Sequence, residues 1–152
     1  MTHTRHQGFT YIELLIVVGL IGIILSLGIV MDIGSLSRSS VIEERDLFVS
    51  LILTGARAHA IANIHESAHG VHIDNTLHQY ILFEGTAFSQ GNPSNRAIKF
   101  TSDHISVTTT GGDDIIFTQL SGDVLLGDGT VTFEGNNATQ YVRINKVGQI
   151  DW

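Results

Sequence analysis

The clearest catalytic signature in the sequence is the segment His65–His69, which reads HESAH and fits the pattern H-E-x-x-H. On a helix, this spacing places two histidines on one face, where they can bind zinc while Glu66 activates the metal-bound water. However, the alternation of His69, Val71 and Ile73 indicates a strand, in which the two histidines would not converge. A tethered zinc hydrolase using His65, Glu66 and His69 is therefore an alternative, and we expect that the chain is not an enzyme.

Other side chains could hold a metal without catalysis. Eight histidines occur in 152 residues, and solvated positions are the simpler interpretation of the five that lie close together in the sequence, namely His59, His65, His69, His72 and His78. The acidic segments GGDD (111–114) and GDG (127–129) lack the alternating oxygen ligands of a calcium loop, so they indicate turns. We predict neither a metal site nor a cofactor.

One carboxylate, Glu13, stands at the start of a long apolar run. From Leu14 to Met31 the run is interrupted only by Ser26 and three glycines. As a helix it would span roughly 27 Å, close to the thickness of the hydrocarbon layer of a bilayer. Arg5 and two histidines precede it without any acid, so the start of the chain should be cytoplasmic and the bulk of it should face outward.

The residues GFTYIELLIVVGLIGIIL, from Gly8 to Leu25, resemble the N-terminus of type IV pilins and type II secretion pseudopilins. The resemblance implies that a prepilin peptidase cuts between Gly8 and Phe9, removes the leader 1–8 and methylates the new amino group of Phe9. It also assigns Glu13 to filament assembly. Many family members carry a proline in the second half of this segment, whereas here Val30 continues the apolar run.

Electrostatics supports that role of Glu13 independently. Cleavage before Phe9 would create a cationic amine in apolar surroundings, and a carboxylate four residues later can neutralise it. The pair could form within one helix or with a neighbouring subunit, and the family resemblance favours the neighbour. The alternative is a plain single-pass anchor whose Glu13 lies in the headgroup region.

After residue 32 the pattern becomes that of an amphipathic helix with a charged patch at Glu43–Asp46. One long helix from Phe9 to about Asn63 is predicted, and the alternative is two helices broken between Asp32 and Ser40, where glycine and serines are poor helix formers. The apolar positions near helical spacing are Val41, Leu47, Leu51, Gly55, Ala58 and Ala62.

From Ala68 onward the hydrophobic period changes to two, with turn residues between short apolar segments. Six to eight strands in meander order are predicted, forming one or two antiparallel sheets that cover the helix. The expected fold class is α+β, with a long N-terminal hydrophobic helix packed on an antiparallel β-sheet head, as in pilins. The expected segments are a leader (1–8), a transmembrane and assembly half-helix (9–31), an amphipathic half-helix (32–66) and a β head (67–152).

A helix ending in ARAHAIA and a head closing on YVRINKVGQI are similar to the H-type minor pseudopilins and their FimT-like pilus counterparts. The resemblance implies a structural subunit of a pilus or pseudopilus. It would first be a single-pass protein of the inner membrane and later part of the filament. The implied partners are prepilin peptidase, other pilin subunits, the assembly platform and membrane lipid.

A FimT-like DNA-uptake protein is the second functional alternative. Nucleic acid is nevertheless an unexpected partner, because the formal net charge is −7 and the only close basic pairs are Arg96 with Lys99 and Arg143 with Lys146. The chain also has no cysteine, which excludes disulfides, thiolate metal sites and thiol nucleophiles.

Overall fold

A computed structural model describes residues 10–135 and 137–152, and it leaves the side chains of residues 26–37 undescribed. The predicted cleavage position between Gly8 and Phe9 therefore lies outside the described residues. Contacts between residues divide the chain into two compact units, Met1–Leu36 and Ser37–Trp152.

The helical part of the chain begins directly after Thr10 and contains three consecutive segments. They are α1 (Tyr11–Ser50), a π-helical turn η1 (Leu51–Arg57) and the short α2 (Ala58–Ile61). Residues 32–40 are helical, so the predicted alternative of a break there is not what the structure has. Asn63 then adopts a left-handed conformation (φ 56°), which ends the helix, and a 3₁₀ turn η2 (Ile64–Glu66) leads into the first strand.

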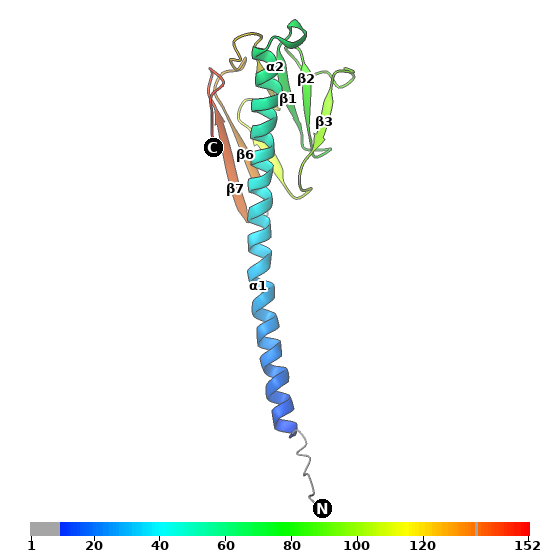
Figure 1. Ribbon diagram of the computed structural model, residues 1–152, viewed down its shortest axis with the longest axis vertical. Helices are drawn as coiled ribbons and strands as arrows, with labels where there is room; N and C mark the ends of the chain where they lie inside the picture. Colours follow the sequence, from blue (N-terminus) through cyan, green and yellow to red (C-terminus); the bar gives the residue numbers. More distant parts are fainter. Residues whose placement is uncertain (1–9, 136) are drawn as a thin grey trace, which may run out of the picture. The chain divides into compact units, whose positions relative to one another are not determined.

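Within the described residues, eight strands follow and form two four-stranded antiparallel sheets. Sheet A has the order β3-β2-β1-β5 and sheet B the order β4-β6-β7-β8. The two sheets flank the helix on opposite sides (Figure 1). The strands are β1 (His69–Asp74), β2 (Gln79–Glu84), β3 (Arg96–Lys99), β4 (Ser106–Thr109), β5 (Asp114–Phe117), β6 (Gly129–Gly135), β7 (Ala138–Ile144) and β8 (Ile150–Asp151).

The predicted meander is correct for β1-β2-β3 and for β6-β7-β8, but not for the two strands between them. β4 joins sheet B, and β5 returns to the edge of sheet A beside β1. Both sheets bury one face in the same core, so the alternation of apolar residues within a strand does not specify which sheet it joins.

The core lies between the helix and both sheets. Phe48 connects the three layers, because its ring is 5.2 Å from that of Tyr80 in β2 and 5.3 Å from that of Phe133 in β6, measured between centroids. The buried helix positions are Val41, Glu44, Phe48, Val49, Ile52, Ala56 and Ala60.

The buried face of the helix differs from the predicted one. Val41 is buried, and Leu47 and Leu51 pack against the core, as the amphipathic pattern predicts. In contrast, Ala58 and Ala62 are exposed, and Glu44 of the predicted charged patch lies in the core. Gly55 lies at the edge of the core, where an added Cβ would come within 2.6 Å of Leu82. The set of buried helix positions differs from the predicted one because the helix packs against two sheets, which together cover more than one narrow stripe of it.

Candidate assembly helix and head surfaces

Glu13 closes a capping box at the start of α1. Its carboxylate oxygen Oε2 accepts hydrogen bonds from the backbone N–H of Thr10 (3.0 Å) and from the Thr10 hydroxyl (2.8 Å). In return, the Glu13 backbone N–H donates to the Thr10 Oγ1 at 3.4 Å. Thr10 and Glu13 therefore satisfy donors that the first helical turn would otherwise leave free.

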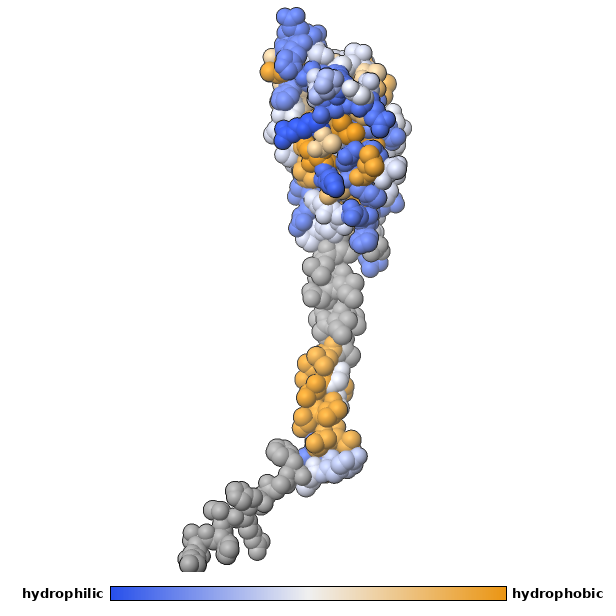
Figure 2. All heavy atoms as spheres, turned by 90° about the vertical axis from the view of Figure 1, so that its right-hand side faces the viewer, coloured by the Kyte–Doolittle hydropathy of each residue, from blue (hydrophilic) through white to orange (hydrophobic). Residues whose placement is uncertain are grey.

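The helix that follows is apolar on all sides and exposed. Every residue from Tyr11 to Leu25 is exposed, so the apolar surface is not restricted to one stripe. Figure 2 colours this part of the helix as hydrophobic. Twelve large hydrophobic side chains lie on it, with exposed fractions from 48% (Val17) to 79% (Tyr11). A helix of this kind is stable in water only when other apolar groups cover it.

The structure contains no membrane-spanning candidate within the described residues, that is, no helix whose described part is both long and apolar enough to cross a bilayer. The predicted span from Leu14 to Met31 extends past Leu25 into residues whose side chains are not described.

The HESAH segment does not form the zinc site that its pattern allowed. His65 lies in the 3₁₀ turn with φ 53°, and His69 begins β1, so the two histidines do not share a helix face. The exposed His65 places its Nδ1 2.7 Å from Oε1 of Glu84, and this hydrogen bond lowers the pKa of the Glu84 carboxyl. His69 is buried, and its Nε2 donates to the Ile64 carbonyl at 2.9 Å.

The other three histidines of this part of the sequence, His59, His72 and His78, contact different groups. His72 lies 2.6 Å from the Asp114 carboxylate and stacks on Phe88, with ring centroids 3.9 Å apart. The His59 ring meets His69 edge-on, and His78 meets a phenylalanine. Within the described parts of the chain, no three histidine or acidic side chains gather in a way that could hold a metal ion.

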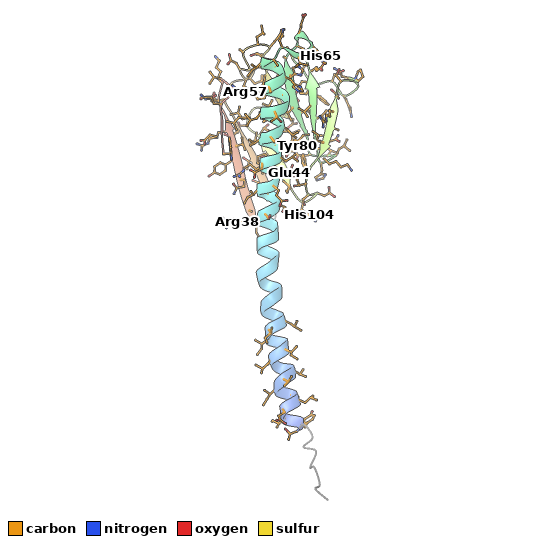
Figure 3. The ribbon with its side chains drawn as sticks, in the orientation of Figure 1. Arg38, Glu44, Arg57, His65, Tyr80 and His104 are labelled. Carbon is orange, nitrogen blue, oxygen red and sulfur yellow. The ribbon has the colours of Figure 1, made fainter. Side chains whose placement is uncertain are left out.

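A buried carboxylate ties the helix to the chain that follows β3. Glu44 has no exposed surface, and its Oε2 accepts hydrogen bonds from the Thr101 backbone N–H and the Thr101 hydroxyl, both at 2.6 Å. Tyr80 lies next to Glu44 in the core (Figure 3). Burial, together with the neighbouring carboxylate, raises the pKa of Tyr80. The Tyr80 hydroxyl and the Glu44 Oε1 both lack a hydrogen bond of good geometry, so Thr101 supplies the interaction that holds the carboxylate.

Two grooves flank the π-helical turn. The first, of about 340 Å³, lies beside sheet A and is lined by the apolar residues Leu51, Leu82 and Ile98, with Arg96 and Glu84 among its polar residues. The second, of about 700 Å³, lies beside β8 and contains Arg57, Arg143 and Trp152. The Arg57 Nε is buried without a hydrogen-bond partner.

Sequence reasoning missed three of these features. The capping box had a readable signal, because Thr10 and Glu13 fit the pattern S/T-x-x-E. The burial of Glu44 had no such signal, since its partner Thr101 is 57 residues away. The presence of Arg57 and Arg143 in the lining of one groove also depends on the fold and not on sequence spacing.

No protein-family model matches the sequence. No curated protein sequence matches it either. Among solved structures, the type IV minor pilin FimU of Pseudomonas aeruginosa is similar to this chain. The TM-score is 0.54 and the identity 16%, over 74% of this chain and 89% of FimU. The minor pseudopilin EpsH from the type 2 secretion system of Vibrio cholerae is similar with a TM-score of 0.50 and 15% identity, over 72% and 92% of the two chains. The chain therefore has an α+β, pilin-like fold, in which an N-terminal helix packs on antiparallel sheets.

Proposed function

We propose that this chain is a structural subunit, a minor pilin or pseudopilin, of a type IV pilus or a type II secretion pseudopilus. The observation that carries the proposal is the helix Tyr11–Leu25, which exposes hydrophobic side chains all round and has one carboxylate in its first turn. The similarity in fold to a minor pilin and to a minor pseudopilin supports it.

The helix needs apolar surroundings in two successive settings. Before assembly these are membrane lipid, with the start of the chain in the cytoplasm and the head outside. After assembly they are the equivalent helices of neighbouring subunits. The partners are prepilin peptidase, which would cut between Gly8 and Phe9, the assembly platform of the inner membrane, and other subunits. No catalytic activity of the chain itself is required.

Glu13 is the residue that would fix the position of one subunit on the next. An unpaired carboxylate at the centre of a spanning helix costs about 2.5–3.5 kcal/mol on insertion scales and less near an end. Pairing with the cationic amine of a neighbouring Phe9 would offset that cost only at one relative position of the two helices. Thr10 already holds the carboxylate on the side of its own helix, which fixes its orientation before assembly.

The capping box allows an experiment that separates charge from helix capping. Glu13→Gln keeps a side chain that can close the box but removes the charge, whereas Thr10→Val keeps the charge and removes the hydroxyl. The proposal predicts that Glu13→Gln abolishes incorporation into filaments, as judged by immunoblots of sheared filaments, and that Thr10→Val retains most of it. Glu43→Gln, the same change at an exposed residue of the head, is the matched control and should incorporate normally.

If the Thr10→Val variant is not incorporated into filaments and the Glu13→Gln variant is, Glu13 acts only as a helix cap. Its proposed role in fixing the position of neighbouring subunits is then wrong. Processing is tested separately by the intact mass of the membrane-extracted protein. Loss of residues 1–8 together with the gain of one methyl group is expected, and an unprocessed N-terminus would refute the proposal.

A second candidate function is DNA binding during uptake, favoured by the groove that is lined by both Arg57 and Arg143, together with Trp152. The groove also contains Asp151, which reduces its positive charge. DNA binding by the full chain in detergent should then weaken with added salt and with Arg143→Gln, but not with Lys99→Gln on the other sheet. Absence of a mobility shift at low salt refutes this candidate.

A further inference from the structure

Three of the four sheet edges are short or covered by other parts of the head. The Asn75 side chain occupies the outer edge of β4, because it accepts a hydrogen bond from the Val107 N–H (3.0 Å) and donates to the Val107 carbonyl (2.6 Å). The outer edge of β5 is covered by residues 124–125. Val124 forms a β-bridge with Phe117, and the Leu125 N–H donates to the Ile116 carbonyl at 2.9 Å. β8 has only two residues. These are recognised ways of preventing unwanted strand pairing.

The edge of β3 is open. The Phe100 N–H donates to the His78 carbonyl, and hydrogen-bonded and non-hydrogen-bonded pairs alternate in an antiparallel ladder. In the register Tyr80 with Ile98 and Ile81 with Ala97, the backbone groups of Ala97 and Lys99 therefore point away from β2. Among the described residues, no hydrogen bond from another segment reaches this outer edge.

The groove beside this edge has the chemistry of a side-chain pocket. Ile98 and Leu82 are among its apolar lining residues, and Arg96, the first residue of the open strand, lines it as well. Seen from the side on which β3 lies in Figure 1, the head shows a hydrophobic area bordered by hydrophilic side chains (Figure 2). Arg96 and Lys99 form no ion pair with any described residue, and β3 contains no acid. The edge is therefore locally basic in a chain of net charge −7.

We propose that the outer edge of β3 is a docking surface for an extended, acidic segment of a neighbouring subunit, which adds to sheet A as a fifth strand. Backbone hydrogen bonds to Ala97 and Lys99 would hold the segment, and an apolar side chain opposite Ile98 would enter the groove. Carboxylates opposite Arg96 and Lys99 would select the partner by charge. The assignment to a neighbouring subunit rests on the proposed filament role, whereas the binding chemistry can be measured without filaments.

Hydrogen–deuterium exchange of the full chain in detergent tests the proposal. The probe is the peptide TTELTETT, blocked at both ends. Paired antiparallel to β3, it places its leucine opposite Ile98 and its two glutamates opposite Arg96 and Lys99. Exchange at Ala97 and Lys99 should slow in proportion to 1 + [L]/Kd, that is by about tenfold at a peptide concentration of about nine times Kd. The charge-reversed peptide TTKLTKTT should produce no slowing.

Ala97→Pro is the matched variant, because proline removes an outward N–H and is tolerated on an edge strand. It should abolish the peptide-dependent slowing at Lys99 while leaving exchange in β1 and β2 unchanged. The proposal is overturned if TTELTETT gives no slowing, if Ala97→Pro binds equally well, or if both peptides slow exchange alike. Slowing without peptide that increases with protein concentration would identify a second copy as the occupant and overturn the assignment of an acidic partner segment.

Discussion

The interaction between Glu44 and Thr101 provides the sharpest test of how the head is held together. Thr101→Val replaces the hydroxyl by a methyl group of similar size, so the buried carboxylate keeps only the backbone N–H as a donor. A hydrogen bond to a charged group contributes about 1.5–3 kcal/mol. We therefore expect the free energy of unfolding to fall by about 2 kcal/mol.

The assay is urea unfolding of the fragment Ser37–Trp152, followed by circular dichroism. Among the residues whose side chains the structure describes, the core cluster contains none before Val41, and the fragment corresponds to one of the two compact units. With an m-value of about 2 kcal/mol per molar urea, the midpoint should fall by about 1 M. Thr108→Val, the same substitution at an exposed position of β4, should change the stability by less than about 0.5 kcal/mol.

A double-mutant cycle identifies the carboxylate as the cause. In a Glu44→Gln background the hydroxyl would bind a neutral acceptor, so the cost of Thr101→Val should decrease from about 2 to about 1 kcal/mol. Equal midpoints for Thr101→Val and Thr108→Val, or equal costs in both backgrounds, would show that the hydroxyl does not stabilise a charged Glu44.

Three further predictions concern turns and edges of the head. Hydrogen bonds from the backbone N–H groups of the following turn lower the pKa of Asp74 below its ordinary value of 3.8, so this stabilisation is complete above that pH and is lost as the pH falls through the folded-state pKa. The difference in urea midpoint between wild type and Asp74→Asn should accordingly be largest at neutral pH and shrink toward pH 3, and a constant difference would contradict it. Gly148→Ala should lower stability by more than about 1 kcal/mol because φ is 72° and the new Cβ would collide with a carbonyl oxygen, whereas Gly91→Ala, which has open space, should have little effect in the same assay. Asn75→Ala removes both hydrogen bonds that cover β4 and should cost about 1–2 kcal/mol, with more dimer in sedimentation experiments, and a monomer of unchanged stability would refute the covering role.

The strands were the most predictable part of the structure. Alternating apolar residues flanked by turn residues predicted six to eight strands after Ala68, and the described residues form eight, because one face of each strand must be buried. The position of His69 in the first strand was predictable for the same reason, and it argued against a zinc site that needs both histidines on one helix face.

Long-range contacts were not predictable from one sequence. The buried position of Glu44 depends on Thr101, and the choice of sheet for β4 depends on its pairing with β6. The π-helical turn Leu51–Arg57 also had no signal, since its residues are ordinary helix formers apart from Thr54 and Gly55. The roles of Gly8, Phe9 and Glu13 remain predictions that derive from the family resemblance and from the chemistry of an amine beside a carboxylate.

The chain enters sheet B with β4 and returns to sheet A with β5, and this order has a consequence for folding. When the chain is presented from its N-terminus, sheet A has all its strands once Phe117 has appeared, but β4 must wait for β6, which begins only at Gly129. During that interval β4 has no strand partner, and Asn75, which precedes it in the chain, is already present to hold it. The Asn75 side chain can thus satisfy backbone groups of β4 and hold this strand in place until β6 completes sheet B.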